Sequence, residues 1–430
     1  MARTPETPTS KATTWLAAGV RTPFARVDGP LSAYDAIALS VPVARAMVAK
    51  LNGARPDFAV WGTVIPNLTW SNIAREVLLD AGLDPTIPAF STVMACSTSM
   101  VGVFEAAGMI DGRGRDLALV GGVEAMSRVQ IGLSQGLSDG LRKFLQAKTL
   151  GQRIGLLSAL KPLSLFIPRV VNRTTGLSMG EHTEITAKEW RIGREDQDRV
   201  ALASHRTAVA AWNRGFFDDL VIPVGDFKRD NLPRPDTSLE RLAKLKPAFD
   251  RTSGQGSLTA GNSSPLTDGA AALWVASDEG LKRLPADTPR VKLIDYEVTS
   301  IDLRTEGLLM APAYGVPRML ARNGLTYADI DLWEIHEAFA AQLLFHIKAW
   351  QDPVFLRDKA GVTADIGVFP VDRVNPNGGS TALGHPFGAT GARILSQAVK
   401  ELATGPSGAR AIVSICADGG QGTMALLEAA

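Results

Sequence analysis

The sequence contains a faint internal repeat, which limits the folds that the chain can adopt. The segments VPVARAMVAK (41–50) and VPRMLARNG (316–324) each precede an Asp and a strand-like run that contains Trp, DFAVWGTVI and DIDLWEIHE. The residues after Cys96 correspond to NGGSTALGHPFGATGARILSQAVKEL (377–402), and LALVGGVEAMS corresponds to AIVSICADGGQG. The three pairs keep the same order and their separation grows steadily along the chain, as one duplication with small insertions would produce. The sequence therefore predicts two halves of the same fold.

Within each half, short apolar runs alternate with segments of helical period. The runs DLALVGG (116–122), DLWEI (331–335) and AIVSICA (411–417) have the length and composition of buried strands. The segment AYDAIALSVPVARAMVAKL (33–51) instead repeats its apolar residues with the period of a helix. Strands that alternate with helices in this way predict an α/β architecture.

The stretch between the halves has a different character. It carries many of the charged residues, several amphipathic helical patterns and the Pro-rich segment NLPRPDTSLERLAKLKPAFD, after which TAGNSSPLTDGAAALWVAS returns to small and apolar residues. We therefore expect an N-terminal half over residues 13–127 that is completed by 251–285, an inserted loop domain over 128–250, and a C-terminal half over 286–430.

The composition excludes several classes of function. A formal net charge of +1 gives no overall field that would attract nucleic acid or an anionic membrane. Two distant cysteines, without a CxxC pair or a His-rich tract, supply neither a disulfide framework nor a zinc site, and they favour a reducing cytoplasm. Residues 1–12 lack the apolar core of a signal peptide, and we expect a frayed tail there. The stretch 154–171 is interrupted by lysine, proline and arginine, so it does not predict a membrane span.

The two cysteines occupy comparable positions in the two halves. Cys96 ends the run AFSTVMA and precedes the helical pattern SMVGVFEAAGMI, so we expect it near a helix N-terminus, where the pKa of a thiol can fall and backbone N–H groups can stabilise an oxyanion. Cys416 ends a strand and precedes a glycine-rich turn, which lets the backbone approach a ligand. A lone cysteine is more often a small buried apolar residue. A pair related by the repeat instead indicates one shared pocket.

Two of the five histidines lie at the same kind of turn. His336 follows the strand DLWEI, and His385 lies among small residues in ALGHPFGATGAR, each just before a helix. The repeat places both at one edge of the sheet, where ligands bind in open α/β folds. His346 lies in the middle of a helix, where we expect a structural residue, and we expect His205 on a helix surface. Together with the two cysteines, His336 and His385 form the candidate catalytic group.

Four sequence blocks match the pattern of a known family. ACSTSM, HEAFAAQ, NPNGGSTALGHPFGATGAR and CADGGQG, in this order and spacing, resemble the active-site blocks of the thiolases. TSLERLAKLKPAFD and TAGNSSPLTDGAAA resemble the loop-domain and CoA-contact stretches of the same family, so the resemblance runs from RTPFAR (21–26) to the C-terminus. It implies the thiolase fold, in which duplicated βαβαβαββ halves form five layers, αβαβα, with an inserted loop domain.

The resemblance also implies a role for each candidate residue. Cys96 corresponds to the nucleophile that becomes acylated, His385 to the base that activates it, and Cys416 to a second, acid–base cysteine. His336 stands where most thiolases have Asn, a form typical of the β subunits of the fatty-acid trifunctional complex and of their relatives in bacterial anaerobic β-oxidation. The residues that the resemblance assigns to binding of the substrate and CoA are Ser264, Met179, Gly384 and Gly419.

Asp418 departs from the family pattern. Thiolases usually have Gly or Ala at this place and use its backbone N–H as an oxyanion donor. Asp418 keeps the amide and adds a carboxylate, whose effect on the pocket stays open at this point.

These assignments imply thiolytic cleavage of 3-ketoacyl-CoA by CoA, through an acyl-Cys96 intermediate, in fatty-acid or related β-oxidation. CoA is then a substrate, and no resident cofactor or metal is expected. The partners that the resemblance implies are a second copy in a homodimer or dimer of dimers, a hydratase–3-hydroxyacyl-CoA dehydrogenase α subunit, and a membrane surface touched by residues 141–170, but not nucleic acid. The implied location is the cytoplasm.

Three alternatives stay open. A biosynthetic acetoacetyl-CoA thiolase would carry the same four groups. A condensing enzyme of the β-ketoacyl synthase type would lack the second cysteine, which this chain has at Cys416. A non-catalytic, thiolase-like lipid carrier would be expected to lack one of the four groups.

Overall fold

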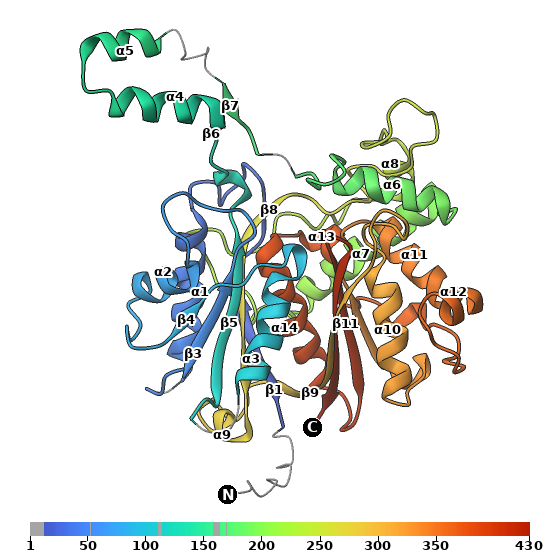
Figure 1. Ribbon diagram of the computed structural model, residues 1–430. Coiled ribbons are helices and arrows are strands. Elements are labelled where there is room, and N and C mark those ends of the chain that lie inside the picture. The colour runs from blue at the N-terminus through green and yellow to red at the C-terminus, as the bar shows by residue number, and fades with distance from the viewer. Residues whose placement is uncertain (1–12, 52, 111–113, 158–163, 169) are drawn as a thin grey trace, which may run out of the picture.

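The computed structural model describes residues 13–430 apart from 52, 111–113, 158–163 and 169. Within these residues, ten strands form one mixed sheet that helices cover, which confirms the predicted α/β architecture (Figure 1). The tail that we expect over residues 1–12 lies outside the described residues.

The first half alternates strands and helices in the predicted order. Its elements are β1 (Trp15–Arg21), β2 (Ala25–Arg26), α1 (Ala36–Ala49), β3 (Phe58–Gly62), α2 (Ile73–Asp80), β4 (Ala89–Phe90), α3 (Thr98–Met109), β5 (Leu117–Glu124), β8 (Thr267–Ala276) and α9 (Asp278–Leu281). Helix α1 begins after Asp35, whose carboxylate accepts a hydrogen bond of 2.8 Å from the backbone N–H of Ala38. This contact satisfies one of the N–H groups that a first helical turn leaves without a partner.

The second half repeats the arrangement. Its elements are β9 (Arg290–Ser300), α10 (Ala311–Arg322), β10 (Leu332–Ile335), α11 (Ala340–Trp350), α12 (Pro353–Asp358), α13 (Ser380–Leu383), α14 (Thr390–Leu402), β11 (Arg410–Ala417) and β12 (Gln421–Ala429). Helices α1 and α10 carry a proline at corresponding positions, Pro42 and Pro317. The sequence repeat is therefore also a structural repeat.

One element of the repeat is reduced in the second half. Where the first half has β4, the second has an isolated parallel bridge between Trp333 and Val374. A longer strand cannot continue from Val374, because Asn375 has a φ of +47° and Pro376 has no N–H to donate to a sheet.

The order of the strands relates the two halves. Across the sheet, nine of the ten run β10, β11, β12, β9, β1, β8, β5, β3, β4, and β2 pairs with β8 beside this order. Strands β1 and β9, the first strands of the two halves, pair antiparallel at the middle, with Trp15 opposite Lys292. The parallel pairs β3–β5 and β10–β11 hold equivalent places on either side. The two halves thus meet along their first strands.

Three hydrophobic cores separate the layers. Helices α1 and α2 pack on one outer face, α10 and α11 lie on the other, and α3 and α14 lie between the two parts of the sheet (Figure 1). On β5, Leu117 and Leu119 face the outer core, whereas Ala118 and Val120 face the middle core, as the two-residue period of a strand requires. The structure thus has the five layers that the resemblance implies.

Helices α3 and α14 cross at close range in the middle layer. The hydroxyl of Ser99 on α3 accepts a hydrogen bond of 2.8 Å from the backbone N–H of Ala392 on α14. A Cβ atom added to Gly391 would lie 2.4 Å from the backbone nitrogen of Met100, so only glycine fits there. The crossing brings the N-terminal ends of the two helices together, and these are the ends that follow Cys96 and His385.

Residues 128–250 form covering helices and a protruding arm. Their elements are β6 (Gly132–Leu133), α4 (Gln135–Gln146), α5 (Leu150–Leu157), β7 (Leu165–Phe166), α6 (Met179–Glu189), α7 (Arg194–Asn213) and α8 (Leu239–Ala243). Helices α6 and α7 pack against α11. The arm, made of β6, α4, α5 and β7, extends away from the body of the protein (Figure 1). Its exposed large apolar residues are Ile131, Leu133, Leu145, Leu150, Ile154, Leu165, Phe166 and Ile167. In the part of the chain that the structure describes, no helix is long and apolar enough to cross a membrane.

Candidate active site

Cys96 lies in a tight turn directly before α3. The turn is a short 3₁₀ helix, Ala95–Ser97, and Ala95 has a φ of +44°, a left-handed conformation that a residue with a Cβ rarely adopts. The hydroxyl of Thr98 supports the turn, since it accepts a hydrogen bond from the N–H of Met94 at 2.9 Å and donates one to the carbonyl of Ala95 at 2.7 Å. The turn holds the Cys96 thiol in a fixed, partly buried position.

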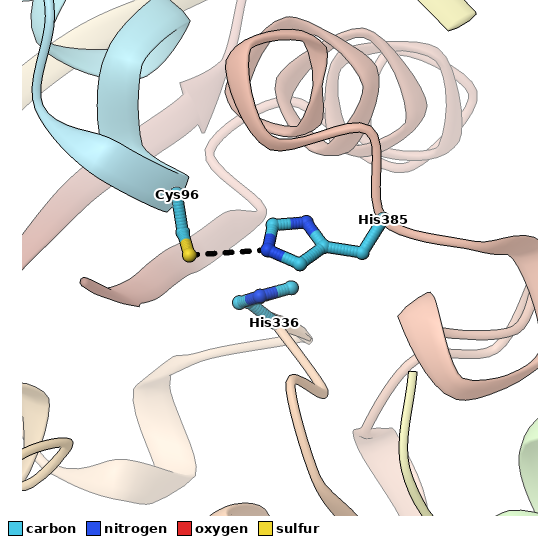
Figure 2. A group of neighbouring side chains, drawn as sticks. All are labelled: Cys96, His336 and His385. Atoms are coloured by element: carbon cyan, nitrogen blue, oxygen red, sulfur yellow. Dashed lines mark hydrogen bonds between the residues drawn. The ribbon is translucent and has the colours of Figure 1, made fainter. Parts of the chain in front are cut away.

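His385 faces the thiol of Cys96. Its Nε2 atom lies 3.1 Å from the Cys96 sulfur, although 289 positions separate the two residues in the chain (Figure 2). On the other side of the ring, Nδ1 lies 2.6 Å from the hydroxyl oxygen of Thr390, the first residue of α14. That hydroxyl donates its hydrogen to the carbonyl of Pro386 at 3.0 Å. It therefore accepts from Nδ1–H, which leaves the Nε2 lone pair free to take the thiol proton.

His336 lies beside His385 and close to Cys96 (Figure 2). The two ring centres are 4.2 Å apart. His336 is fully buried, and its Nδ1 atom lies 2.8 Å from the hydroxyl oxygen of Ser380. Among the described residues, its Nε2 atom has no hydrogen-bond partner.

Cys416 is buried at the end of β11, close enough to Cys96 for a negative charge on one thiol to raise the pKa of the other. Burial is the larger cause, and together they raise the pKa of Cys416 well above its ordinary value. Cys416 therefore holds its proton at neutral pH, as a general acid must.

Two donors hold the carboxylate of Asp418. Asn172, in the segment before α6, donates from its side-chain amide to the Asp418 carboxylate at 2.8 Å, and the N–H of Gly419 donates to the same oxygen at 2.7 Å. The backbone N–H of Asp418 donates toward the sulfur of Cys96. The amide that the family pattern requires is thus present, while the carboxylate joins the loop domain to the turn after Cys416.

The pKa of the Cys96 thiol is raised rather than lowered, which corrects the expectation from its place at a helix N-terminus. Burial is the main cause, and the negative charge of Asp418 adds to it, so that the pKa rises to about 12. Burial also lowers the pKa of His385 to about 3, with the positive charge of Arg393 as a second cause. At rest, the pair is therefore a neutral thiol facing a neutral imidazole.

A buried carboxylate anchors the surroundings of the site. Glu124, at the end of β5, accepts hydrogen bonds from the N–H of Gly388 at 3.1 Å, the N–H of Ile65 at 3.0 Å and the hydroxyl of Thr63 at 2.9 Å. It therefore ties the turn after His385 to the loop that follows β3. Burial raises the pKa of Glu124, because charging the carboxylate costs more away from water.

The four residues predicted to bind substrate and CoA lie in different settings. Gly384 ends α13 with a φ of +95°, and an added Cβ would lie 2.5 Å from a methyl group of Leu232. Met179 is the first residue of α6 and is partly buried. The N–H of Ser264 donates to the carbonyl of Ala338, just beyond His336, at 2.9 Å. The N–H of Gly419 is already engaged by Asp418.

The other histidines are outside the catalytic group. His346 is buried on α11 and contacts the side chain of Gln342 and the carbonyl of Leu309, which agrees with the structural role that we expect. His205 is buried rather than on a helix surface, and its Nδ1 accepts a hydrogen bond from the N–H of Arg234 at 3.2 Å. That expectation was wrong because the segment before α8 covers this face of α7.

Sequence reasoning missed two residues that contact the candidate histidines, His336 and His385. Ser380 and Thr390 lie on either side of His385, inside the quoted block NPNGGSTALGHPFGATGAR. Their hydroxyl groups were the available signal, because a buried hydroxyl needs a hydrogen-bond partner and can itself donate to, or accept from, a nearby histidine ring. Cys96, His336 and His385 are also the described residues whose side-chain atoms come near enough, within 4.8 Å, to share a metal ion. A thiol that faces an imidazole lone pair is equally the arrangement of a nucleophile and its base.

Comparison with known proteins decides the family. Residues 14–279 match the N-terminal domain of thiolase, and residues 287–429 match the C-terminal domain. The chain belongs to the thiolase family. Two thiolases similar in sequence are the 3-ketoacyl-CoA thiolases of Yersinia enterocolitica and Yersinia pestis, each 38% identical. The first alignment covers 96% of both chains and the second 95% of both.

Solved thiolase structures have the same fold over nearly the whole chain. An acetyl-CoA acetyltransferase from Bacillus anthracis matches with a TM-score of 0.78 and 31% identity, over 98% of this chain and all of its own. A thiolase from Ascaris suum, in complex with coenzyme A, matches with a TM-score of 0.77 and 27% identity, over 97% of this chain and all of its own.

Proposed function

We propose that this thiolase cleaves 3-ketoacyl-CoA with CoA to give acetyl-CoA and a shortened acyl-CoA. The observation that carries the proposal is the 3.1 Å contact between the Cys96 sulfur and the His385 Nε2 lone pair, with the protonated thiol of Cys416 close by. The relatives named 3-ketoacyl-CoA thiolase support the choice of substrate.

The first half-reaction forms an acyl-enzyme. His385 removes the thiol proton of Cys96 as the sulfur attacks the 3-keto carbon, and the bond between C2 and C3 breaks. The electron pair of that bond stays with C2, as the enolate of acetyl-CoA. Cys416 gives its proton to C2 and releases acetyl-CoA. The acyl group remains on Cys96 as a thioester.

The second half-reaction reverses the proton transfers. The Cys416 thiolate takes the proton from the thiol of incoming CoA, and the CoA sulfur attacks the thioester carbon. Cys96 then leaves as a thiolate and regains its proton from His385. The neutral resting pair fits this route, because the thiolate forms only when a substrate carbonyl is there to react with it.

Negative charge develops on an oxygen atom at two points of this reaction, and each oxygen needs hydrogen-bond donors. We propose that the backbone N–H groups of Cys96 and Asp418, which already point at the Cys96 sulfur, donate hydrogen bonds to the thioester oxygen. We assign the enolate oxygen to His336, whose Nε2 is buried without a partner among the described residues.

The CoA portion of the substrate is assigned to the loop domain. We assign Met179, at the start of α6, and Ser264, whose N–H contacts the carbonyl of Ala338, to this part of the substrate, and Gly384 allows the close approach of the chain beside His385. Gly419 would form part of the turn that borders the substrate, with its N–H holding Asp418 in place.

The proposed partners follow from surfaces outside the pocket. The apolar side chains of the arm support contact with a membrane surface or a hydratase–dehydrogenase subunit. The exposed Tyr296 and Val298 on β9 support a homodimer, and two unpaired cysteines support a cytoplasmic location.

The test is release of acetyl-CoA from a 3-ketoacyl-CoA and CoA. The wild-type protein is expected to form it, and to carry an acyl adduct on Cys96 that mass spectrometry detects when free CoA is left out. Cys96→Ala is expected to do neither. An adduct that persists in Cys96→Ala would place the nucleophile elsewhere.

A biosynthetic acetoacetyl-CoA thiolase is the second candidate, favoured by the similarity to the acetyl-CoA acetyltransferase structure. Thiolysis rates for 3-ketoacyl-CoA substrates with four to sixteen acyl carbons distinguish the biosynthetic from the degradative enzyme. Activity confined to the four-carbon substrate would favour the biosynthetic enzyme, and activity on longer chains the degradative one.

A further inference from the structure

We propose that Ser380, oriented by Arg393, is a positioning residue that holds His336 in the tautomer with its proton on Nε2. The proposal rests on the thiolysis described above and names how one of its oxyanion donors is made. It concerns two buried side chains.

The direction of each hydrogen bond follows from what each group can donate. Arg393 can only donate, and its Nη2 lies 2.6 Å from the Ser380 hydroxyl oxygen. That oxygen also lies 2.8 Å from Nδ1 of His336. These are the two partners of the Ser380 hydroxyl among the described residues, and only His336 can accept. Ser380 therefore accepts from Arg393 and donates to Nδ1.

The opposite tautomer would leave two buried groups unsatisfied. With the proton on Nδ1, Ser380 would accept from both neighbours, and its own hydrogen would have no acceptor among the described residues. Nε2 would then present a lone pair to the pocket, where the enolate oxygen becomes negative. A buried polar group without a partner is costly, so the proton belongs on Nε2.

The doubly protonated form of His336 is also disfavoured. Burial lowers the pKa of His336 well below its ordinary value, and the nearby His385 and Arg393 add to this effect. Arg393 itself stays charged at neutral pH, because burial lowers its pKa only to about 10. Its charge polarises the Ser380 hydroxyl toward His336. The neutral ring thus offers an N–H at Nε2, the ring nitrogen without a hydrogen-bond partner among the described residues.

His336 and His385 consequently hold their protons on opposite nitrogens. Thr390 accepts from Nδ1 of His385 and frees its Nε2 as a base, whereas Ser380 donates to Nδ1 of His336 and makes its Nε2 a donor. Two hydroxyl groups therefore give two neighbouring imidazoles different chemical roles.

The first experiment reads the tautomer without turnover. In protein labelled with ¹⁵N-histidine, the His336 signals, assigned by their loss in His336→Asn, are expected to show a protonated Nε2 and an unprotonated Nδ1. In Ser380→Ala, we expect either a mixture of the two tautomers or a ring that carries its proton on Nδ1. The proposal is overturned by a proton on Nδ1 in the wild type, or by an unchanged tautomer in Ser380→Ala.

The second experiment is a double-mutant cycle on kcat. An asparagine amide always has N–H donors, so Ser380→Ala should matter only when residue 336 is histidine. Because loss of a whole oxyanion donor costs about 10²–10³-fold, we expect Ser380→Ala to lower kcat by roughly tenfold or more in the wild type, with KM little changed, and to have no further effect in His336→Asn. An equal loss in both backgrounds would overturn the proposal.

A matched control removes a buried hydroxyl that, among the described residues, contacts neither histidine and neither Ser380 nor Arg393 by a hydrogen bond. Ser396 on α14 accepts a hydrogen bond from the N–H of Gly19, and Ser396→Ala should leave both kcat and the His336 signals unchanged. If the wild type cleaves no 3-ketoacyl-CoA, the proposed function fails, and the NMR measurement still tests the tautomer.

Discussion

Ser99 and Ala392 join the two halves of the protein through a hydrogen bond of 2.8 Å in the middle layer. The contact fixes α3 against α14, and the two helices follow the turns that contain Cys96 and His385. The distance between Cys96 and His385 therefore depends on how closely these helices pack. A change at their crossing should affect both stability and catalysis.

Gly391→Ala tests this crossing. Alanine favours a helix over glycine by about 0.5–1 kcal/mol, but its Cβ would lie 2.4 Å from the backbone nitrogen of Met100. Overpacking of this kind costs about 1–3 kcal/mol, so we expect a net loss of stability in urea denaturation, and slower acylation of Cys96. Gly108→Ala, on an exposed part of α3 with open space around it, is the control and should stabilise the protein.

Thr390→Val should impair His385 as a base. Valine keeps the shape of threonine but cannot accept from Nδ1–H, so the ring loses the contact that leaves its lone pair toward Cys96. We expect kcat to fall by about tenfold or more, since general-base catalysis contributes 10²–10⁴-fold in total. Thr390→Ser should keep most of the activity. Equal losses in the two variants would show that the methyl group, and not the hydroxyl, matters.

Asp418→Asn should make Cys96 more reactive. The negative charge of Asp418 is, after burial, the second cause of the raised pKa of Cys96, so neutralising it should lower that pKa and increase the thiolate fraction. We expect severalfold faster alkylation of Cys96 by iodoacetamide near pH 8, measured by mass spectrometry. Asp139→Asn, on the exposed helix α4, should leave the rate unchanged. A slower reaction in Asp418→Asn would contradict the electrostatic argument.

His205 should make the protein less stable in mild acid. Burial lowers its pKa from 6.5 in the unfolded chain to about 4 in the folded protein. Between these values the unfolded chain binds a proton that the folded chain does not, so stability is full above pH 6.5 and falls as the pH decreases. When the pH falls from about 7 to about 5, the free energy of unfolding of the wild type should decrease by about 2 kcal/mol more than that of His205→Gln. Urea denaturation at the two pH values measures the difference. Equal decreases in the free energy of unfolding of the two proteins would show that His205 is exposed to water in the folded protein, and would contradict the prediction.

Much of the fold and the site could be predicted from the sequence. Strands and helices were recognisable because the buried strands are short apolar runs and α1 has a clear helical period. The four candidate groups were recognisable because each lies in a short turn among small residues. Cys96, His336 and Cys416 lie near the ends of strands, whereas His385 lies between α13 and α14 rather than after a strand. The repeat then indicated that these turns lie at one edge.

The electrostatics of the site could not be predicted in the same way. A helix N-terminus lowers the pKa of a thiol, but desolvation raises it, and the balance depends on how deeply the neighbouring segments bury Cys96. His205 lies in ALASHRTAVAAW, between Ser204 and Arg206, and the surrounding alanines do not show which face of the helix is buried. Its burial depends on a segment distant in sequence, around Arg234.

The middle core contains side chains from both halves, including Val103 from α3 and Leu395 from α14. A single half, separated from the other, would leave one side of its central helix in water. An ancestral chain of one repeat would therefore have needed a second copy to fold, and its active site would have formed between two molecules. A duplication that joined such a pair into one polypeptide would have removed the need for a second molecule. The two joined copies could then differ, as they do at Cys96 in the first half and His385 in the second.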